Sequence, residues 1–214
     1  MLTGGAGGRA VKRAFADLFG LDRLDAPAVA GRTDQWIFSE MVRRHDVTAD
    51  VATYGRLREV YLMHLAREMR APNPDKRVLP GVRLLLDALS ARADVCLGLL
   101  TGNLAAGARI KLDHFDLWRY FGGGGGFGDA SLERTSLYRD AIAAVARATG
   151  VTFAPRDTVI VGDTPLDVAV ALDTGARSLA VATGGYGAED LRQAGADAVL
   201  DDLSDLTQVL TALG

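Results

Sequence analysis

Two aspartates in the C-terminal part of the sequence carry its strongest chemical signal. Asp163 and Asp167 lie in the segment VGDTPLD, residues 161–167, where a short apolar run gives way to a helical pattern. Residues four apart share a helix face, so both carboxylates can point toward one spot just beyond the run. With phosphate nearby, such oxygen ligands favour Mg²⁺, which binds one or two carboxylates together with water and phosphate oxygens. The structural alternative is that Asp163 caps the helix and Asp167 complements its dipole.

A second polar segment, LLTGN at residues 99–103, also ends an apolar run. A hydroxyl in that position donates one hydrogen bond to an oxyanion, and the free amides at the start of the next helix donate more. Thr101, Gly102 and Asn103 are therefore candidates for binding phosphate. The alternative is a simple helix cap, because Thr and Asn are common immediately before helices.

A cation that could hold the phosphate lies between these two segments. Arg134 stands in DASLERTS, residues 129–136, where a helical pattern begins. A guanidinium there can bind a phosphate and balance a neighbouring carboxylate. Lys111 is a second candidate. Its position in the middle of an expected helix favours the surface, with the aliphatic stem on the protein and the ammonium in water.

The spacing of apolar residues predicts two parts that meet near Pro80. Before this residue the spacing is only helical, at about residues 11–19, 36–42 and 49–69, and Thr48 is the expected N-cap of the last helix. After it, strands are expected at residues 95–100, 158–161, 178–182 and 198–200. Helices are expected between and after them at residues 82–91, 104–112, 136–149, 166–173, 188–194 and 203–213. The glycine run at residues 122–126 is expected to form a mobile loop.

Short apolar strands separated by helices are typical of a parallel sheet covered on both faces. We therefore predict an α/β fold with a doubly wound parallel sheet. A helical domain is expected at residues 1–78 and the α/β domain at residues 79–214. Ligands of such sheets bind beyond the carboxyl ends of the strands, which is where Thr101 and Asp163 are expected.

Composition excludes several classes of partner. The net charge of −3 and the pI near 5.6 provide no basic surface for nucleic acid. No run approaches the roughly 20 apolar residues that span a bilayer, so no membrane partner is expected. A single cysteine, Cys96, cannot form an internal disulfide, and this favours a reducing, cytoplasmic setting. The oligomeric state is not indicated by the sequence.

Together these segments resemble a known family. LLTGN is similar to the second motif of haloacid-dehalogenase-like hydrolases, and IVGDTPLD at residues 160–167 is similar to their fourth. Residues 79–81, 108–112 and 182–186 extend the resemblance over nearly the whole chain, and it is strongest to the phosphoglycolate-phosphatase-type branch. The resemblance implies a Rossmann-like core with an N-terminal helical cap. It also implies Mg²⁺-dependent hydrolysis of a small, phosphoglycolate-like phosphomonoester.

The resemblance also implies roles for individual residues. Thr101 would hydrogen-bond the phosphoryl group, helped by the backbone around Gly102 and Asn103. Arg134 would stabilise the phosphoryl charge, although the family usually has lysine there. Asp163 would bind Mg²⁺, with Asp167 beside it. In the cap, the segment GRTD at residues 31–34 resembles a loop that faces the active site, which makes Arg32 and Thr33 candidates for substrate contact; Asp34 reads equally well as an N-cap.

One departure from the family bears on activity. The family's first motif, Asp-x-Asp-Gly-Thr, supplies the nucleophile and the general acid and base, and this sequence does not contain it. In the family that motif closely precedes a segment like LTGGAG, residues 2–7, so the chain is expected to begin just after it. The motif's strand lies between those that end at Thr101 and Asp163, and its loss would leave two unpaired strand edges and an apolar slot.

Three interpretations remain open. The sequence is a truncated or mis-started phosphatase that is inactive in this form, which we favour because the other site residues are intact. Alternatively, it is a true short form that binds phosphorylated ligands or partners without catalysis. A haloacid dehalogenase would share the fold but would need neither Mg²⁺ nor the Asp163 and Asp167 pair.

Overall fold

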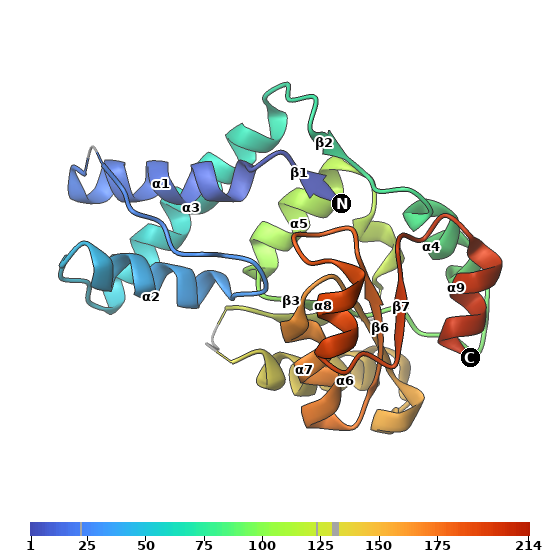
Figure 1. The fold of residues 1–214 in the computed structure, drawn as a ribbon. Helices are drawn as coiled ribbons and strands as arrows, with labels where there is room; N and C mark the ends of the chain where they lie inside the picture. The colour runs from blue at the N-terminus through green and yellow to red at the C-terminus, as the bar shows by residue number, and fades with distance from the viewer. Residues whose placement is uncertain (22, 123, 130–132) are drawn as a thin grey trace.

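The computed structural model describes residues 1–21, 23–122, 124–129 and 133–214. The N-terminal part is helical and lies at one end of the molecule (Figure 1), with α1 at Ala6–Phe19, α2 at Asp34–Arg44 and α3 at Val51–Arg70. These helices share one apolar core, whose largest fully buried side chains are Phe15, Phe38, Met41, Leu57, Tyr61, Leu65 and Met69. Two short strands that the sequence did not predict, β1 (Leu2–Thr3) and β2 (Lys76–Arg77), pair antiparallel beside it.

Two expected helix caps are wrong by one or two residues. Thr33 caps α2, because its hydroxyl oxygen accepts the Trp36 N–H at 3.1 Å, and Asp34 is the first helical residue. Asp50, not Thr48, caps α3 by accepting the Thr53 N–H at 2.8 Å. In both cases the capping oxygen lies three residues before the amide that it satisfies.

Helix α1 is held to α3 by a carboxylate, which gives a prediction for stability. The Glu68 side chain is only 7% exposed and accepts Arg9 Nε at 2.7 Å and Arg13 Nη1 at 2.9 Å. The Arg9 hydrogen bond holds the pKa of Glu68 below its usual value, so the stabilisation is present above the unfolded-state pKa near 4.5 and is lost as the pH falls. Glu68→Gln should lower the free energy of unfolding by about 1–2 kcal/mol at neutral pH.

Urea unfolding of both proteins at a series of pH values checks this expectation. The difference in unfolding free energy should shrink as the pH falls below 4.5, because the unfolded wild-type chain then binds a proton that the native Glu68 carboxylate takes up only at lower pH. Glu59→Gln on the exposed face of α3 is the matched control and should change stability by less than about 0.5 kcal/mol. A Glu68→Gln effect that does not change with pH would contradict the assigned role.

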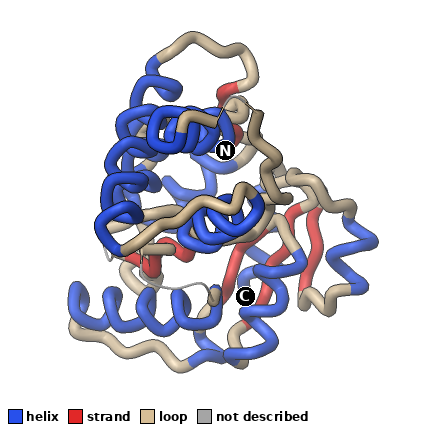
Figure 2. Tube along the Cα trace, turned by 90° about the vertical axis from the view of Figure 1, so that its left-hand side faces the viewer, coloured by secondary structure: helices blue, strands red, loops and turns tan. Residues whose placement is uncertain are grey.

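Helices and parallel strands alternate in the rest of the chain, as predicted. The strands are β3 (Leu99–Thr101), β4 (Gly125–Phe127), β5 (Val159–Gly162), β6 (Arg177–Val181) and β7 (Ala198–Leu200). The helices are α4 (Val82–Ser90), α5 (Ala105–His114), α6 (Arg134–Thr149), α7 (Pro165–Thr174), α8 (Ala188–Gln193) and α9 (Leu206–Leu213), with short 3₁₀ turns at Trp118–Tyr120 and Pro155–Asp157. Helices flank the strands on both sides (Figure 2). The α/β class is therefore confirmed.

Alternate residues of β6 face the two helical layers. Leu179 packs with Leu85 of α4 and Val209 of α9, whereas Ala180 packs with Val168 of α7 and Leu191 of α8. A strand covered on both faces in this way is expected to be apolar throughout, as β6 is apart from its first two residues. Among the described residues, no helix is long and apolar enough to cross a membrane.

The parallel strands form two separate sheets. Among the described residues β3 pairs only with β4, and β5 pairs with β6, which in turn pairs with β7. One edge of β3 and one edge of β5 therefore lack a strand partner, as expected for a sheet without its central strand. The side chain of Val161 in β5 is 45% exposed, which is unusual for a strand in such a core. Residues 95–98, expected to be strand, lie outside β3, which begins at Leu99.

The expected mobile loop at residues 122–126 is wrong for its second half. Gly125 and Gly126 belong to β4, and Gly123 lies outside the described residues. A Cβ on Gly125 would lie 2.5 Å from the carbonyl oxygen of Leu99, and one on Gly126 would collide with the backbone of Leu137. Glycine is therefore required at both positions, because β4 packs closely between β3 and α6.

Candidate functional site

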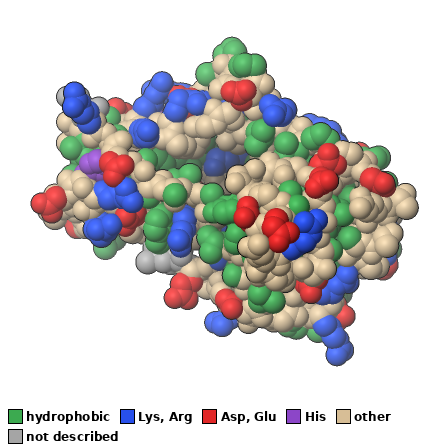
Figure 3. Space-filling model, viewed as in Figure 1, with side chains coloured by type: hydrophobic (Ala, Val, Ile, Leu, Met, Phe, Trp, Pro, Cys, Tyr) green, Lys and Arg blue, Asp and Glu red, His purple; other side chains and the backbone are tan. Residues whose placement is uncertain are grey.

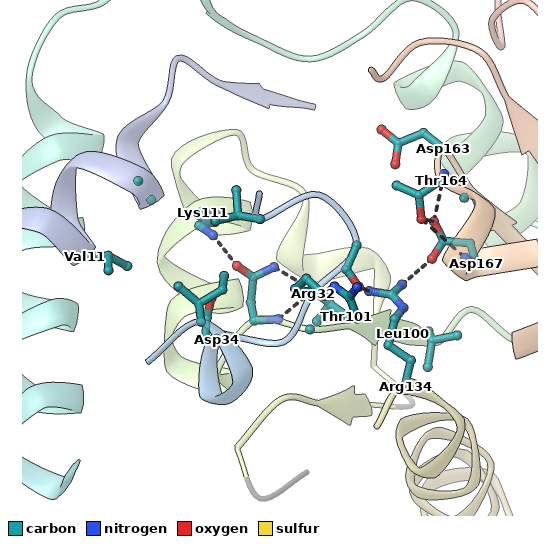
Figure 4. A pocket seen from close by; sticks show the side chains of 18 of the residues that line it. Val11, Arg32, Asp34, Leu100, Thr101, Lys111, Arg134, Asp163, Thr164 and Asp167 are labelled. Carbon is teal, nitrogen blue, oxygen red and sulfur yellow. Dashed lines mark hydrogen bonds and ion pairs between the residues drawn. The ribbon is translucent and has the colours of Figure 1, made fainter. Parts of the chain in front are cut away.

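A cavity of about 370 Å³ lies between the helical part and the strand ends. Figure 3 shows this face hollowed between the two parts of the molecule, with Lys or Arg atoms in the recess. The cavity is lined by the ends of β3 and β5, the loop before α2 and the first turn of α1. Its polar lining includes Thr101, Asn103, Arg134, Asp163 and Asp167, so the structure brings the predicted residues of all three segments to one place (Figure 4).

Asp163 directly follows β5, and its carboxylate lines the cavity. None of the described side chains hydrogen-bonds this carboxylate, and it does not cap α7. Burial raises the pKa of Asp163, and the negative charge of Asp167 raises it further. A Cβ on Gly184 would lie 2.6 Å from the Asp163 Oδ2 atom, so the loop after β6 requires a residue without a side chain at this position. The amino group of Met1 is close enough that Asp163 acts on its pKa.

Asp167 is held on both sides by protein groups. Its Oδ2 atom accepts the Thr164 hydroxyl at 2.8 Å and the Thr164 N–H at 3.1 Å, and its Oδ1 atom forms an ion pair with Arg134. Thr164 is the N-cap of α7 and Asp167 completes the capping box. The structural alternative is therefore right about Asp167 and wrong about Asp163. Of the two carboxylates, Asp163 is the one free to bind a metal.

Arg134 begins α6 and points into the same end of the cavity. Its Nη2 atom forms the ion pair with Asp167, and its Nη1 atom donates to the Gly31 carbonyl oxygen at 3.0 Å. Its buried Nε–H has no hydrogen-bond partner among the described residues. A buried donor of a cation without an acceptor is costly, and an anion in the cavity would remove that cost.

The loop after β3 holds its polar groups in a fixed arrangement. The Thr101 hydroxyl oxygen accepts the Asn103 side-chain amide at 2.6 Å and the Asn103 N–H at 3.2 Å, which leaves the hydroxyl proton available to a ligand. The Gly102 carbonyl oxygen accepts the Asp34 N–H at 2.7 Å. A Cβ on Gly102 would collide with the backbone of Arg32, so a glycine is required where the loop before α2 meets this loop.

The two residues expected to face the substrate from the helical part differ in placement. Arg32 lines the cavity, and its guanidinium lies 4.7 Å from the centre of the Trp36 ring. Thr33 is 1% exposed and caps α2 with its hydroxyl oxygen. The structure thus leaves Arg32 in position for a ligand and gives Thr33 a capping contact.

Two charged cavity residues were not assigned to the site from the sequence. Lys111, expected at the surface, is turned inward and donates to the Oδ1 atom of Asn103. Burial lowers its pKa, and Asp34 opposes this shift. Asp34 lines the cavity as well, with its own pKa raised by burial. The small residues Gly107 and Ala108, one turn earlier in α5, were the available signal, since they let this helix pack closely on α3.

A bound metal would rest on few protein ligands. The described residues contain no group of three Asp, Glu, His or Cys side chains placed to hold an ion. Asp163 nevertheless fits a magnesium ligand, because its carboxylate lines the cavity, accepts no hydrogen bond from any described side chain and lies near a second carboxylate. Mg²⁺ commonly completes its shell with water and phosphate oxygens, so one or two carboxylates suffice.

Comparisons with known proteins identify the fold and match one part of the sequence to a family model. Residues 134–206 match the family model described as HAD-hydrolase-like. CbbY from Rhodobacter sphaeroides in complex with phosphate has a TM-score of 0.73 at 19% identity, covering 96% of this chain and 92% of that one. CbbY in complex with xylulose-(1,5)bisphosphate has a TM-score of 0.70 at 18% identity, covering 94% and 88%. No curated protein matches the sequence.

A third solved structure is described as a predicted phosphoglycolate phosphatase from Haemophilus somnus 129pt. Its TM-score is 0.67 at 16% identity, and the likeness covers 96% of this chain and 90% of that one. At these identities the likeness establishes the fold, and the family model covers α6 through the start of α9. The chain thus has the fold of the haloacid-dehalogenase-like hydrolases, and its residues 134–206 carry that family's sequence model.

Proposed function

We propose that this protein binds Mg²⁺ and the phosphate group of a small phosphomonoester, such as phosphoglycolate, in the cavity between the strand ends and the helical part. The observation that carries the proposal is a pair of groups at one end of the cavity: among the described residues, the buried Nε–H of Arg134 has no acceptor, and the Asp163 carboxylate accepts no hydrogen bond from a side chain. A bound anion would accept a hydrogen bond from Arg134, and a bound cation would pair with the Asp163 carboxylate. Magnesium phosphate supplies both ions.

Each residue then has a defined task. Arg134 donates to the phosphate, while its ion pair with Asp167 fixes the guanidinium. Thr101 donates its hydroxyl proton, and the backbone amide of Gly102 adds a donor, because the Asn103 N–H is already bound to the Thr101 hydroxyl oxygen. Asp163 is a ligand for Mg²⁺, with Asp167 beside it. When bound, the metal would neutralise phosphate charge that develops during transfer.

The protein is proposed to bind such ligands without hydrolysing them in this form. The sequence contains no Asp-x-Asp-Gly-Thr segment, and among the described residues no aspartate other than Asp163 and Asp167 lies at the end of the cavity that holds Arg134. The unpaired edges of β3 and β5 support this proposal, because they would accept a further strand between them. We propose that a strand ending in that motif is what the site needs for turnover.

The same proposal gives the two parts their roles. Residues 1–78 would act as a cap that covers the cavity, and residues 79–214 as the core that carries the phosphate site. Arg32 would contact the substrate from the cap side, since it lines the cavity beside the Thr101 loop. A cytoplasmic setting remains a prediction from the single cysteine.

Thermal unfolding in the presence of ligands tests the binding proposal. Phosphate with Mg²⁺ should raise the melting temperature, because a ligand that binds only the folded state stabilises it, and neither ion alone should match the effect. Hydrolysis of p-nitrophenyl phosphate should stay at background. Robust Mg²⁺-dependent turnover that disappears in Asp163→Ala would overturn the proposed lack of catalysis.

A further inference from the structure

Two charged side chains of the cavity take no part in holding phosphate or metal. Lys111 comes from α5 and Asp34 from the first turn of α2. Figure 4 shows both on the side of the cavity near Val11 of α1, away from Asp163 and Asp167. The cavity of about 370 Å³ far exceeds the roughly 30 Å³ that one water occupies in the liquid. It therefore has room for more of a ligand than its phosphoryl group.

The ammonium of Lys111 has donors to spare. It donates to Asn103 Oδ1, and among the described residues it has no ion pair with Asp34. An ammonium carries three donors, so two remain for a ligand. The neighbouring residue of α1 is Gly7, which has no side chain. A Cβ added to it would lie 3.5 Å from the Lys111 Nζ atom and 4.0 Å from the Tyr61 hydroxyl oxygen. That absent side chain leaves space beside the ammonium.

Asp34 supplies the complementary acceptor. Its Oδ2 atom accepts the Leu104 N–H at 2.8 Å and the Tyr61 hydroxyl at 3.4 Å, which fixes the carboxylate. None of the described residues hydrogen-bonds its Oδ1 atom. The Asp34 and Lys111 charges act on each other without direct contact, each opposing the shift that burial causes in the other's pKa. A donor and an acceptor thus lie close together with a gap between them.

A hydroxyl group is the ligand group that suits this pair, because it accepts from an ammonium and donates to a carboxylate at once. A second anion suits it less well, because Asp34 would repel it. We propose that Lys111 and Asp34 form a second subsite, which binds a hydroxyl group on the carbon chain of the phosphorylated ligand. This assignment rests on the proposed function and narrows its ligand class: hydroxylated phosphomonoesters, such as polyol or sugar phosphates, are preferred over phosphoglycolate, whose carboxylate Asp34 would repel.

Calorimetric titration in Mg²⁺ tests the subsite with four probes: inorganic phosphate, propyl phosphate, glycerol 3-phosphate and phosphoglycolate. The wild type should bind glycerol 3-phosphate about tenfold more tightly than propyl phosphate, as expected when hydroxyl hydrogen bonds to charged groups are gained. Lys111→Met and Asp34→Asn should each bring this ratio close to one. Asparagine retains an acceptor for the Leu104 N–H, so the second variant keeps that contact.

Gly7→Ala provides a variant that adds rather than removes a group. Its methyl would fill the space beside Lys111 at an ordinary contact distance, and alanine is favourable within a helix, so the protein should fold. Gly7→Ala should lower the ratio of the affinities for glycerol 3-phosphate and propyl phosphate, as Lys111→Met does. Gly55→Ala in α3 is the matched control, because its Cβ meets nothing within 4 Å and should leave the ratio unchanged.

The possible outcomes are distinct. Equal weakening of inorganic phosphate and both esters by Lys111→Met would show that Lys111 acts through Asn103 on the phosphate site, and would overturn the subsite. Tighter binding of phosphoglycolate than of glycerol 3-phosphate would overturn the choice of a hydroxyl. A wild type that binds no phosphate at all would contradict the proposed function itself, whichever ester is used.

Discussion

Arg134→Met is expected to destabilise the folded protein by about 3 kcal/mol or more. The Arg134 and Asp167 side chains are only 14% and 12% exposed, so removing the guanidinium leaves a buried carboxylate without its cation. The contact between Arg134 and the Gly31 carbonyl oxygen, which ties α6 to the loop before α2, is lost as well. Urea unfolding of wild type and variant measures the difference directly.

Two further variants separate charge from geometry. Arg134→Lys keeps a cation, as the family usually has at this position, and should recover part of the stability and of the phosphate affinity. Arg134→Met combined with Asp167→Asn removes both charges, and should be more stable than Arg134→Met alone because no unpaired charge stays buried. If Arg134→Met cost less than about 1 kcal/mol, the central role of this ion pair would be wrong.

Restoring a strand between β3 and β5 is expected to have the largest effect on activity. In a fusion, an extended apolar segment ending in Asp-x-Asp-Gly-Thr would precede Met1, whose amino group lies close to Asp163. The segment would pair with both free strand edges and would cover Val161, which is 45% exposed. Mg²⁺-dependent hydrolysis of p-nitrophenyl phosphate should rise by at least about a thousandfold, the scale of effect that a nucleophile has in covalent catalysis.

The matched control is the same fusion with asparagine in place of the first aspartate of the motif. It should gain the same stability as the active fusion, because the strand and its apolar side chains are unchanged. It should remain at background activity, because the attacking carboxylate is absent. Equal activity in the two fusions, or no gain in stability in either, would contradict a strand slot between β3 and β5.

Residue type and position relative to the expected strands were enough to predict where the site residues gather. Thr101 is the last residue of β3 and Asp163 directly follows β5. The carboxyl ends of parallel strands lie at one edge of a sheet, so the meeting of these two residues follows from topology. The gap between β3 and β5 followed from the missing first motif. Arg134 was predicted as a site residue because it stands at the start of a helix. Its ion pair with Asp167 was not predicted, because it depends on how α6 and α7 pack together.

What escaped prediction depends on contacts between distant segments. Lys111 looked like a surface residue because a helical pattern alone does not show that the cavity lies against α5. Gly125 and Gly126 looked like a loop because the strand they form needs Leu99 and Leu137 as close neighbours. The N-cap of α2 was off by one residue because Thr33 and Asp34 are both good caps, and Asp34 is drawn inward by the Leu104 amide.

Calorimetric titration of inorganic phosphate into the wild-type protein, with Mg²⁺ and then with EDTA, tests the central claim most directly. Phosphate should bind in Mg²⁺ and lose most of its affinity in EDTA, because Asp163 and Asp167 would otherwise face the anion without a cation between them. Asp163→Asn should weaken the Mg²⁺-dependent part and leave the fold intact. Phosphate binding that is the same with Mg²⁺ and with EDTA, or that Asp163→Asn leaves unchanged, would contradict a magnesium phosphate site.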